Sequence, residues 1–438
     1  MRNLRANLPI VLLTGLAFFL RLHRLDALNL WYDEAFSLRF ATIGLAEMIR
    51  NCLTFETNPP FYPFVLHFWV RIFGDSEFSL RFPSVLFGTA CVPLAYALGA
   101  RSLSRFAGGF AAIVVAASPF YIYFSQEARA YALFSFLCLS SIYFLEAKAK
   151  VLFAASLVLA LWTHAFGVFL LVSLNIYQLL RLRGNGEALR GWVRLQVVIV
   201  VLSCPWYLAF LQDPEAYRST LIWIESLPRP EFPGLLDTYT GFAAPWVKGG
   251  AALLCLPGLW RLRSANRKPL LFLTTWFLLS FAVPASLGRI WHPFLLPRHT
   301  IAASIGLLLV VGALLEWISH SSRALAGVLA SLLLFQYGFS YEQYLASVKK
   351  TEWEKAFTTI IAGGNLPATV LISPRYHKDA GPEYYVRKLK ARHKIKLTYD
   401  GATGQGNHWK IHVQFQVPSF AEPPRSESHF HGLRLEKL

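Results

Sequence analysis

Apolar segments recur along most of this chain, and they constrain its fold more than any other feature. A helix crosses the hydrocarbon core of a bilayer when about 20 consecutive residues are predominantly apolar. The sequence is 55% hydrophobic and 15% charged, whereas soluble proteins carry about 25% charged residues. We therefore expect an α-helical polytopic membrane protein. The candidate spans are residues 8–20, 80–100, 107–124, 130–146, 151–162, 165–180, 195–211, 247–260, 270–288, 300–317 and 324–341.

The distribution of basic residues predicts the orientation of these spans. Lys and Arg are enriched in the cytoplasmic loops of membrane proteins. All basic clusters fall on one side only if residues 61–73, a short apolar stretch interrupted by His67 and Arg71, lie in the interface or re-enter. The sequence then predicts eleven spans, a cytoplasmic N-terminus and an exterior C-terminus. The clusters are Arg2/Arg5, Arg101/Arg105, Lys148/Lys150, Arg181/Arg183/Arg190/Arg194, Arg261/Arg263/Arg267/Lys268 and Arg323.

A change in composition near residue 345 predicts two domains. Residues 1–344 form the membrane domain, with a first exterior loop at 22–79, and residues 345–438 form a small exterior α/β domain. The first apolar run is interpreted as a retained span, because no small-residue cleavage site follows it. The last twenty residues, rich in Pro, Ser, Glu and His, are expected to be poorly ordered. The C-terminal domain is predicted to contain helices at 352–362 and 383–389 and strands at 369–373, 394–398 and 410–417.

Charge and motif content narrow the classes of function. Much of the net charge of +17 lies in short loops between spans, so it does not indicate a nucleic-acid partner. The five cysteines and the C-terminal histidines lack the spacing of metal ligands. No Gly-rich phosphate loop follows a strand, which argues against a nucleotide-sugar donor. No cofactor is required, and a divalent metal could serve but is not indicated.

Two adjacent carboxylates, Asp33 and Glu34, follow the first apolar run. They are flanked by Trp31, Tyr32 and Phe36, and aromatic rings of this kind favour the level of the lipid headgroups. A carboxylate pair at such a depth is costly unless it has a function. The alternative is an Asp-Glu start to a surface helix, where acidic groups suit the positive end of the helix dipole.

Other ionisable groups gather near span ends on the predicted exterior face. They include Glu127, Arg129, His164 and Arg298, and their common side indicates a reaction chamber open to the exterior. Each has a structural alternative. Glu127 could pair with an arginine elsewhere, and His164 could be a hydrogen-bonded interfacial histidine. Arg298 could be an anchor at the membrane edge.

Five motifs carry a resemblance to a known family. They cover roughly the first 180 residues in order, and P-R-H-T at 297–300 is similar to the family's Pro-Arg-Tyr element. The chain resembles the bacterial polyprenyl-phosphate-sugar-dependent membrane glycosyltransferases of the C-type fold, which are related to protein O-mannosyltransferases and lipid A aminoarabinose transferases. The motifs are W-Y-D-E-A-F-S at 31–37, N-P-P-F-Y at 58–62, G-D-S-E-F-S-L-R-F-P-S at 74–84, S-P-F-Y-I-Y-F-S-Q-E-A-R-A-Y-A at 118–132 and W-T-H-A-F-G at 162–167.

The resemblance implies a hexosyl- or pentosyltransferase that uses a lipid-linked sugar. The family's first-loop acidic residue corresponds to Asp33, with Glu34 beside it. Where the family commonly has His-Pro-Pro, this chain has Asn58, so an acid–base or metal role at that position is in doubt: an amide cannot shuttle a proton at neutral pH. The candidate substrate-binding residues are Asn58, Glu127, Arg129, His164 and Arg298.

Transfer from a polyprenyl monophosphate needs a base for the acceptor hydroxyl and cations for the departing phosphate. We expect Asp33 to be the base and Glu34 to orient substrate or bond a neighbouring helix. Arg129 and Arg298 are the candidate phosphate ligands, because a guanidinium matches phosphate geometry. Arg81 could serve as well or could be only an anchor at a helix end. Attack by an acceptor in one step implies inversion at the anomeric carbon.

Partners and location follow from this interpretation. The expected partners are the lipid-linked donor, membrane lipids and a hydroxyl acceptor, which is an envelope lipid, a glycan or a protein. The expected location is the bacterial inner membrane, with the active site exterior. A lipid transporter or flippase is one alternative, although no convincing repeat relates the two halves of the chain. A non-catalytic polyprenyl-lipid-binding protein is the other.

Overall fold

The chain forms two compact units in a computed structural model. The helical unit comprises Met1–His23, Leu45–Tyr62 and Pro83–Glu342, and the sheet unit comprises Arg24–Gly44, Pro63–Phe82 and Gln343–Leu438. The sheet unit thus takes in two segments of the first predicted exterior loop. The structure describes residues 2–54, 56, 58–212, 267–290, 295–332, 335, 350, 352–363, 366–373, 380–391, 395–399, 408–413 and 433–437. The predicted span at 247–260 and nearly all of the predicted loop at 212–245 lie outside these residues.

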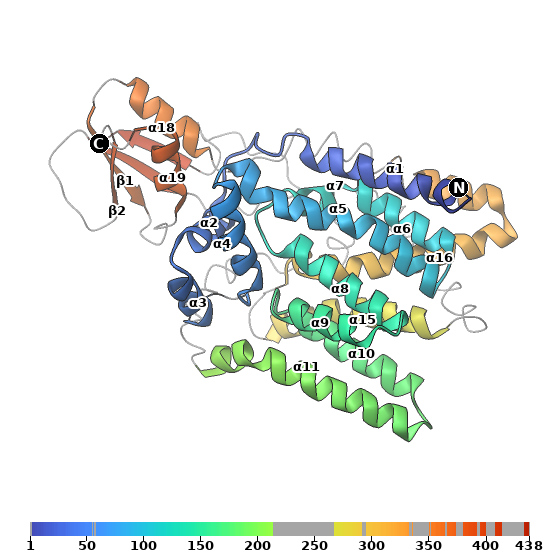
Figure 1. Cartoon of the computed structure of the whole chain (residues 1–438). Coiled ribbons are helices and arrows are strands. Elements are labelled where there is room, and N and C mark those ends of the chain that lie inside the picture. Colours follow the sequence, from blue (N-terminus) through green and yellow to red (C-terminus); the bar gives the residue numbers. More distant parts are fainter. Residues whose placement is uncertain are drawn as a thin grey trace. The chain divides into compact units, whose positions relative to one another are not determined.

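The helical unit is a bundle in which helices distant in sequence pack together (Figure 1). Helix α16 packs against α6, α8 and α15, while α10 packs against α15. Its described elements are α1 (Arg2–Leu22), α3 (Leu45–Thr54), α5 (Glu77–Ser102, which belongs to this unit from Pro83 onward), α6 (Arg105–Ala117), α7 (Pro119–Ser125), α8 (Tyr131–Glu146), α9 (Lys150–Leu161), α10 (Gly167–Arg181), α11 (Gly186–Gln212), α15 (Arg267–Ile290), η1 (Pro297–Thr300) and α16 (Ile301–Ser321).

Several of these helices have the length and composition of membrane spans. Among the described residues, four helices are long and apolar enough to cross a bilayer, namely Glu77–Ser102, Gly186–Ala209, Pro269–Gly288 and Pro297–Ser321, and the bent pair α6–α7 would make a fifth. Helices α8, α9 and α10 have 16, 12 and 15 residues, short of the roughly 20 that a full crossing requires. The count of eleven spans therefore stays a prediction.

The predicted span at 107–124 is broken, and a buried arginine occupies the break. Helices α6 and α7 meet at 61° before Pro119. Proline has no N–H, so the carbonyl of Val115 lacks its usual helical donor. The Arg21 guanidinium supplies donors instead: its Nη2 lies 2.7 Å from Val115 O, and its Nη1 lies 3.3 Å from Ala116 O. Its Nε also donates to Ser125 Oγ at 3.1 Å.

Two glycines allow α5 and α6 to approach closely. A Cβ added at Gly99 would lie 2.4 Å from the Cα of Gly108, and one added at Gly108 would lie 2.4 Å from the backbone oxygen of Tyr96. Real Cβ atoms do not approach other atoms so closely, so only glycine permits this crossing. Small residues at helix crossings are typical of membrane bundles, where packing and not hydrophobicity joins helices.

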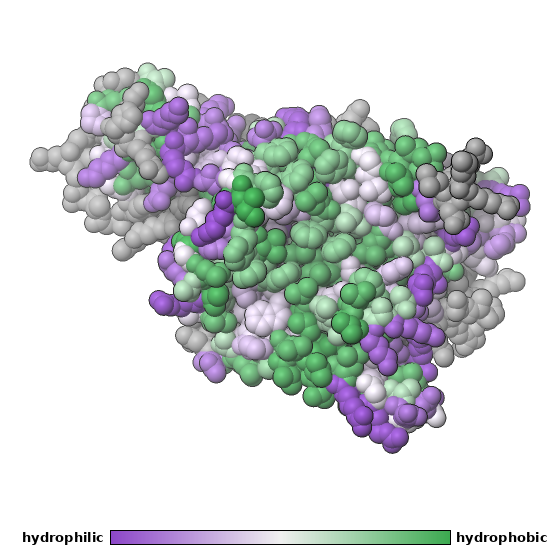
Figure 2. Space-filling model, viewed as in Figure 1, coloured by the Kyte–Doolittle hydropathy of each residue, from purple (hydrophilic) through white to green (hydrophobic). Residues whose placement is uncertain are grey.

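Apolar side chains gather on the surface of the helical unit. The face shown in Figure 2 is mostly apolar over its helices, and hydrophilic residues collect at the end of α11 near its connection with α10. Helix α11 contributes much of this surface, as expected for a helix exposed to lipid. Its exposed aliphatic residues are Val193, Val197, Val198, Val200, Val201, Leu202, Leu208 and Leu211.

The sheet unit contains a four-stranded mixed sheet in the order β2-β1-β3-β4. Strand β1 pairs in parallel with β2 and β3, and β3 pairs antiparallel with β4. Residues Val370 and Ile372 of β1 are fully buried, as the alternation of a central strand requires. The elements are β1 (Ala368–Ser373), β2 (Ile395–Tyr399), β3 (His408–Val413) and β4 (Leu433–Lys437), with helices α18 (Trp353–Ala362) and α19 (Ala380–Lys388).

The sequence predicted α18, α19 and the first three strands near their observed positions. It was wrong about the chain end, because Leu433–Lys437 form β4 although the last twenty residues were expected to be poorly ordered. Pairing gives β4 its order: Trp409 lies opposite Lys437 and Val413 lies opposite Leu433. The composition of the last twenty residues argued against an ordered structure, but backbone hydrogen bonds to β3 order Leu433–Lys437.

The sheet unit also contains α2 (Tyr32–Thr42), α4 (Phe61–Phe73) from Pro63 onward, and the start of α5 as far as Phe82. Arg71 of α4 donates from Nη1 to Ala41 O at 3.1 Å and from Nη2 to Ile43 O at 3.3 Å, so it satisfies carbonyls at the end of α2. With 13 residues, α4 is too short to cross a bilayer alone. Its interfacial position stays a prediction.

Candidate active site

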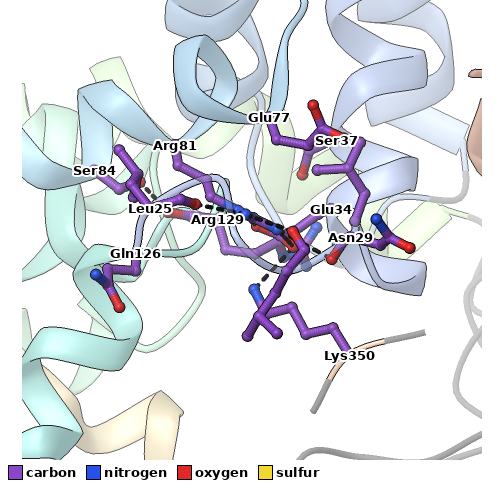
Figure 3. Close-up of polar contacts among 12 residues, drawn as sticks. Leu25, Asn29, Glu34, Ser37, Glu77, Arg81, Ser84, Gln126, Arg129 and Lys350 are labelled. Carbon is purple, nitrogen blue, oxygen red and sulfur yellow. Dashed lines mark hydrogen bonds and ion pairs between the residues drawn. The ribbon is translucent and has the colours of Figure 1, made fainter. Parts of the chain in front are cut away.

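Arg81 organises the loop that leads to the carboxylate pair. Its Nη1 donates to Leu25 O at 2.7 Å and to Leu28 O at 2.8 Å, and its Nη2 donates to Asn29 O at 3.1 Å. Its Nε and Nη2 bind the two oxygens of Glu34 at 2.7 and 2.8 Å (Figure 3). A guanidinium has five N–H donors, and these five bonds use all of them. Arg81 is therefore a structural clamp and has no donor left for a phosphate.

Lys350 binds the same carboxylate. Its Nζ lies 2.9 Å from Glu34 Oε2, and the side chains of both residues are almost completely buried. In Figure 3 Lys350 and Arg81 approach Glu34 from different sides. Glu34 thus accepts from two cations, one on α5 and one from a residue 316 positions later in the chain.

These cations determine the charge of Glu34. Burial opposes its ionisation, but Arg81 and Lys350 more than offset that effect and hold the pKa of Glu34 at about 2, below its ordinary value of 4.5. A carboxylate with so low a pKa is a weak base, and both of its oxygens are engaged. The geometry favours a structural part for Glu34, which is the helix-bonding alternative expected from the sequence.

Asp33 lies in the first turn of α2 beside Glu34. The side chain is largely buried, with 7% of the residue exposed. The backbone carbonyl of Asp33 accepts a hydrogen bond from Ser37 Oγ at 3.1 Å. Helix α2 begins at Tyr32, so Asp33 and Glu34 lie in its first turn, where the positive end of the helix dipole favours carboxylates. Unlike a surface helix start, this one is buried.

A second cluster lies in the helical unit and contains two arginines and a histidine. Arg298 belongs to η1, and its guanidinium carbon lies 5.8 Å from the centre of the Tyr131 ring. The His164 ring lies 5.9 Å from the same tyrosine and 5.6 Å from the ring of His299. Arg129 is close enough to affect the charge of His164. The structure therefore brings together three of the predicted residues: Arg129, His164 and Arg298.

His164 is neutral in this setting. It lies in the connection between α9 and α10, where burial lowers its pKa and the charges of Arg129 and Arg298 lower it further, to about 3. Its Nδ1 accepts a hydrogen bond from the N–H of Phe166 at 3.2 Å. This assigns the proton of the neutral ring to Nε2, since one ring nitrogen accepts and the other donates. His164 can therefore donate one hydrogen bond but supplies no positive charge.

Two other predicted residues belong to the same unit. Glu127 is fully buried, and its backbone carbonyl accepts from the N–H of Arg129 at 2.8 Å. The carbonyl of Arg129 in turn accepts from Ser84 Oγ at 3.3 Å, which fixes the backbone of this turn. Asn58 is half-buried and donates from its N–H and Nδ2 to Glu56 Oε1 at 3.1 and 3.4 Å. Asn58 therefore binds a neighbouring carboxylate.

Sequence reasoning missed Lys350 and the ion pair of Arg81 with Glu34, although it considered Arg81 as an anchor at a helix end. Lys350 ends a Lys-Lys pair near the start of the predicted C-terminal domain, and its neighbours give no sign of a buried partner. The burial of Arg81 depends on loop carbonyls that no motif specifies. Within the described ranges, no group of three or more His, Cys, Asp or Glu side chains is placed to hold a metal ion.

Comparison with known proteins identifies the fold. Residues 57–208 match the family model described as dolichyl-phosphate-mannose-protein mannosyltransferase. A search of curated proteins finds no match. The chain is similar to the crystal structure of ArnT from Cupriavidus metallidurans bound to undecaprenyl phosphate, with a TM-score of 0.61 and 15% identity over 93% of each chain. It has the C-type glycosyltransferase fold.

The likeness to C-type structures extends further. The oligosaccharyltransferase of Archaeoglobus fulgidus gives a TM-score of 0.55 at 11% identity, over 88% of this chain and 64% of the other. The mycobacterial arabinofuranosyltransferase AftD gives 0.50 at 14% identity, over 90% of this chain and 32% of the other. The resemblance expected from the sequence motifs is thereby confirmed. The family match includes Asn58, Glu127, Arg129 and His164 but begins after Asp33.

Proposed function

We propose that the protein is an inverting glycosyltransferase of the C-type fold. It transfers a sugar from a polyprenyl-phosphate carrier to a hydroxyl acceptor on the exterior face of the bacterial inner membrane. The observation that carries the proposal is the buried carboxylate pair in the first turn of α2: two cations hold Glu34 and lower its pKa, and Asp33 beside it corresponds to the acidic residue of the first loop in the resembled family. The fold supports it, because the similar structures include ArnT with undecaprenyl phosphate bound.

In the proposed reaction Asp33 accepts the proton of the acceptor hydroxyl. The hydroxyl oxygen forms a bond to the anomeric carbon as the bond from that carbon to the phosphate oxygen breaks. The electron pair of the broken bond leaves with polyprenyl phosphate, and the proton stays on the carboxyl group of Asp33 until solvent removes it. One displacement at one carbon inverts its configuration. General base catalysis of this kind contributes roughly 100- to 10,000-fold to the rate.

The departing phosphate gains negative charge, which fixed cations stabilise. Arg129 and Arg298 are the proposed ligands. Both lie near the neutral His164, and one guanidinium can bind two phosphate oxygens at once. His164 would add a hydrogen bond from Nε2 without competing for the charge. Glu127 and Asn58 are proposed to shape the same site through the backbone of Arg129 and through Glu56.

The test compares wild type with Asp33→Asn, both purified into lipid nanodiscs. Each receives a panel of undecaprenyl-phosphate sugars with envelope-lipid, glycan and peptide acceptors, and mass spectrometry follows released undecaprenyl phosphate and product. We expect wild type to turn over at least one donor and Asp33→Asn to lose at least 100-fold in kcat. Asp26→Asn is the matched control, because Asp26 is an exposed acid in the same loop.

The other outcomes separate the alternatives. Equal turnover by wild type and Asp33→Asn would remove Asp33 as the base and leave Glu127 as the next acid to test. Saturable binding of undecaprenyl phosphate without turnover of any donor would instead favour a non-catalytic lipid-binding protein. Movement of the lipid between leaflets by both variants would favour a transporter.

A further inference from the structure

The C-terminal part of the chain bonds the loop that carries the proposed base. The hydroxyl of Tyr385 in α19 accepts from the N–H of Leu30 at 2.7 Å. The side chain of Asn29 exchanges two hydrogen bonds with Glu354 of α18, at 3.4 and 3.2 Å. Together with Lys350 and Glu34, this makes three connections within six residues of the loop and the start of α2, all inside the sheet unit.

Side chains of α19 also bind the first turn of α5. Glu77 accepts from the hydroxyls of Tyr384 at 2.8 Å and Tyr385 at 3.2 Å, and from Lys388 Nζ at 2.7 Å. Arg81 follows one turn later on α5, so these bonds also fix the residue that clamps Glu34. The C-terminal helices therefore reach the carboxylate pair by two routes, one through the loop and one through α5.

Lys350 is the most direct of these connections. Only 3% of its side chain is exposed, and a buried ammonium is expensive unless an anion faces it. The carboxylate that faces it belongs to Glu34, whose neighbour in the first turn of α2 is Asp33. A displacement of Lys350 would remove one of the two cations that fix this turn.

We infer that Lys350 is a positioning residue for Asp33: by binding Glu34 it holds the first turn of α2 and makes the C-terminal segment part of the reaction centre. This inference rests on the proposed function, in which Asp33 is the base. The contact that carries the inference is the bond from Lys350 Nζ to Glu34 Oε2. Its effect is geometric, and a misplacement of about 1 Å can lower a rate by roughly 100-fold.

Lys350→Met is the informative variant, because it leaves a balanced charge pair. Glu34 keeps both of its bonds to Arg81, so the buried carboxylate remains neutralised and the fold is expected to survive. Lys350→Arg restores the charge. Lys355→Met is the matched control, since Lys355 is five residues away and 61% of its side chain is exposed.

The first measurement is hydrogen exchange by mass spectrometry in the segment 24–44 of the intact protein in nanodiscs. We expect faster exchange in Lys350→Met, wild-type exchange in Lys355→Met and recovery in Lys350→Arg. Tyr385→Phe should accelerate exchange at Leu30 by a route that involves no charge. Unchanged exchange in Lys350→Met overturns the inference whether or not a donor is known.

The second measurement is turnover of the undecaprenyl-phosphate sugar that wild type uses. We expect Lys350→Met to lower kcat roughly 10- to 100-fold while KM for the donor changes less than about threefold, because the base is misplaced and donor binding is not. Equal losses in kcat and in the amount of folded protein would indicate a structural effect only and reject positioning. If wild type uses no donor, the proposed function fails. The exchange measurement then still tests whether Lys350 holds the loop and the first turn of α2 in place.

Discussion

Glu34 illustrates what a buried carboxylate requires at the scale of one residue. The side chain is completely buried, so its charge is stable only where cations replace water. Arg81 supplies two bonds in a fixed plane and Lys350 supplies a third. Asp33 is one position away in the same turn of α2, and in the proposed function the two adjacent carboxylates perform different tasks.

Removal of the Glu34 charge should destabilise the protein. Glu34→Gln removes the anion that faces both Arg81 and Lys350, and loss of one partner of a buried ion pair costs about 3–5 kcal/mol. Unfolding in a fixed detergent measures the difference. Glu47→Gln is the control, because Glu47 is an exposed acid on α3. Equal stabilities of the two variants would show that the ion pairs contribute nothing net.

The pH dependence of stability should also reveal the contribution of the Glu34 carboxylate. The pKa of Glu34 is about 2 in the folded protein and 4.5 ordinarily, so its contribution is complete above pH 4.5 and is lost as the pH falls toward 2. Wild type should lose stability across this window, and Glu34→Gln should lose less. An identical slope in both proteins between these pH values would contradict the assignment.

Sequence analysis selected the two carboxylates as candidate site residues but did not predict which residues bind Glu34. Asp33 and Glu34 stood out because acidic residues beside an apolar run are rare. Lys350 lies 316 residues from Glu34 in the chain, and no local pattern relates positions so far apart. Arg81 was considered as an anchor, and the structure gives the reason: loop carbonyls and Glu34 occupy its donors.

At the scale of elements, the contact between α5 and α6 depends on glycine. Gly108→Ala should lower stability by about 1–3 kcal/mol, because the new Cβ would collide with backbone atoms of α5. Gly109→Ala is a matched control: it follows directly in the same helix and has no atom within 4 Å of an added Cβ. Unfolding of the purified variants measures both. Equal effects would show that helix propensity, and not the close approach, determines the result.

Helix periodicity and strand alternation predicted most elements of the sheet unit, because their signals are local. In α18, Trp353, Ala356, Phe357 and Ile360 are buried at the spacing of one helical face. The break between α6 and α7 was missed, since an apolar run with one proline resembles a continuous span. Strand β4 was missed because its order comes from β3.

At the scale of the whole molecule, the predicted orientation can be tested with cysteine labelling. Arg183→Cys lies in the exposed connection between α10 and α11, and Lys355→Cys lies on the exposed face of α18. The positive-inside rule places the first in the cytoplasm and the C-terminal segment outside. A membrane-impermeant maleimide should label only Lys355→Cys in intact cells and both variants after permeabilisation. Wild type controls for native cysteines, and the reverse pattern would invert the predicted topology.

Hydropathy predicted where apolar helices lie in the chain, whereas the number of membrane crossings stays a prediction. The runs at 130–146, 151–162 and 165–180 correspond to α8, α9 and α10, which are real but short. A hydropathy pattern reports that a segment avoids water, and it does not distinguish burial in lipid from burial among other helices. In the helical unit, α8 packs against α9 and α16, so part of its apolar surface faces protein.

The bond between Arg21 and the break in α6–α7 has a consequence for how the protein is made. The carbonyl that Nη2 binds follows Arg21 by 94 residues, and Ser125 follows it by 104. At a translation rate of 5–20 residues per second, the arginine leaves the ribosome about 5–20 s before its acceptors exist. During that interval the end of α1 must keep its charge hydrated at the edge of the bilayer. Arg21 can form these bonds only after helices α6 and α7 have been synthesised.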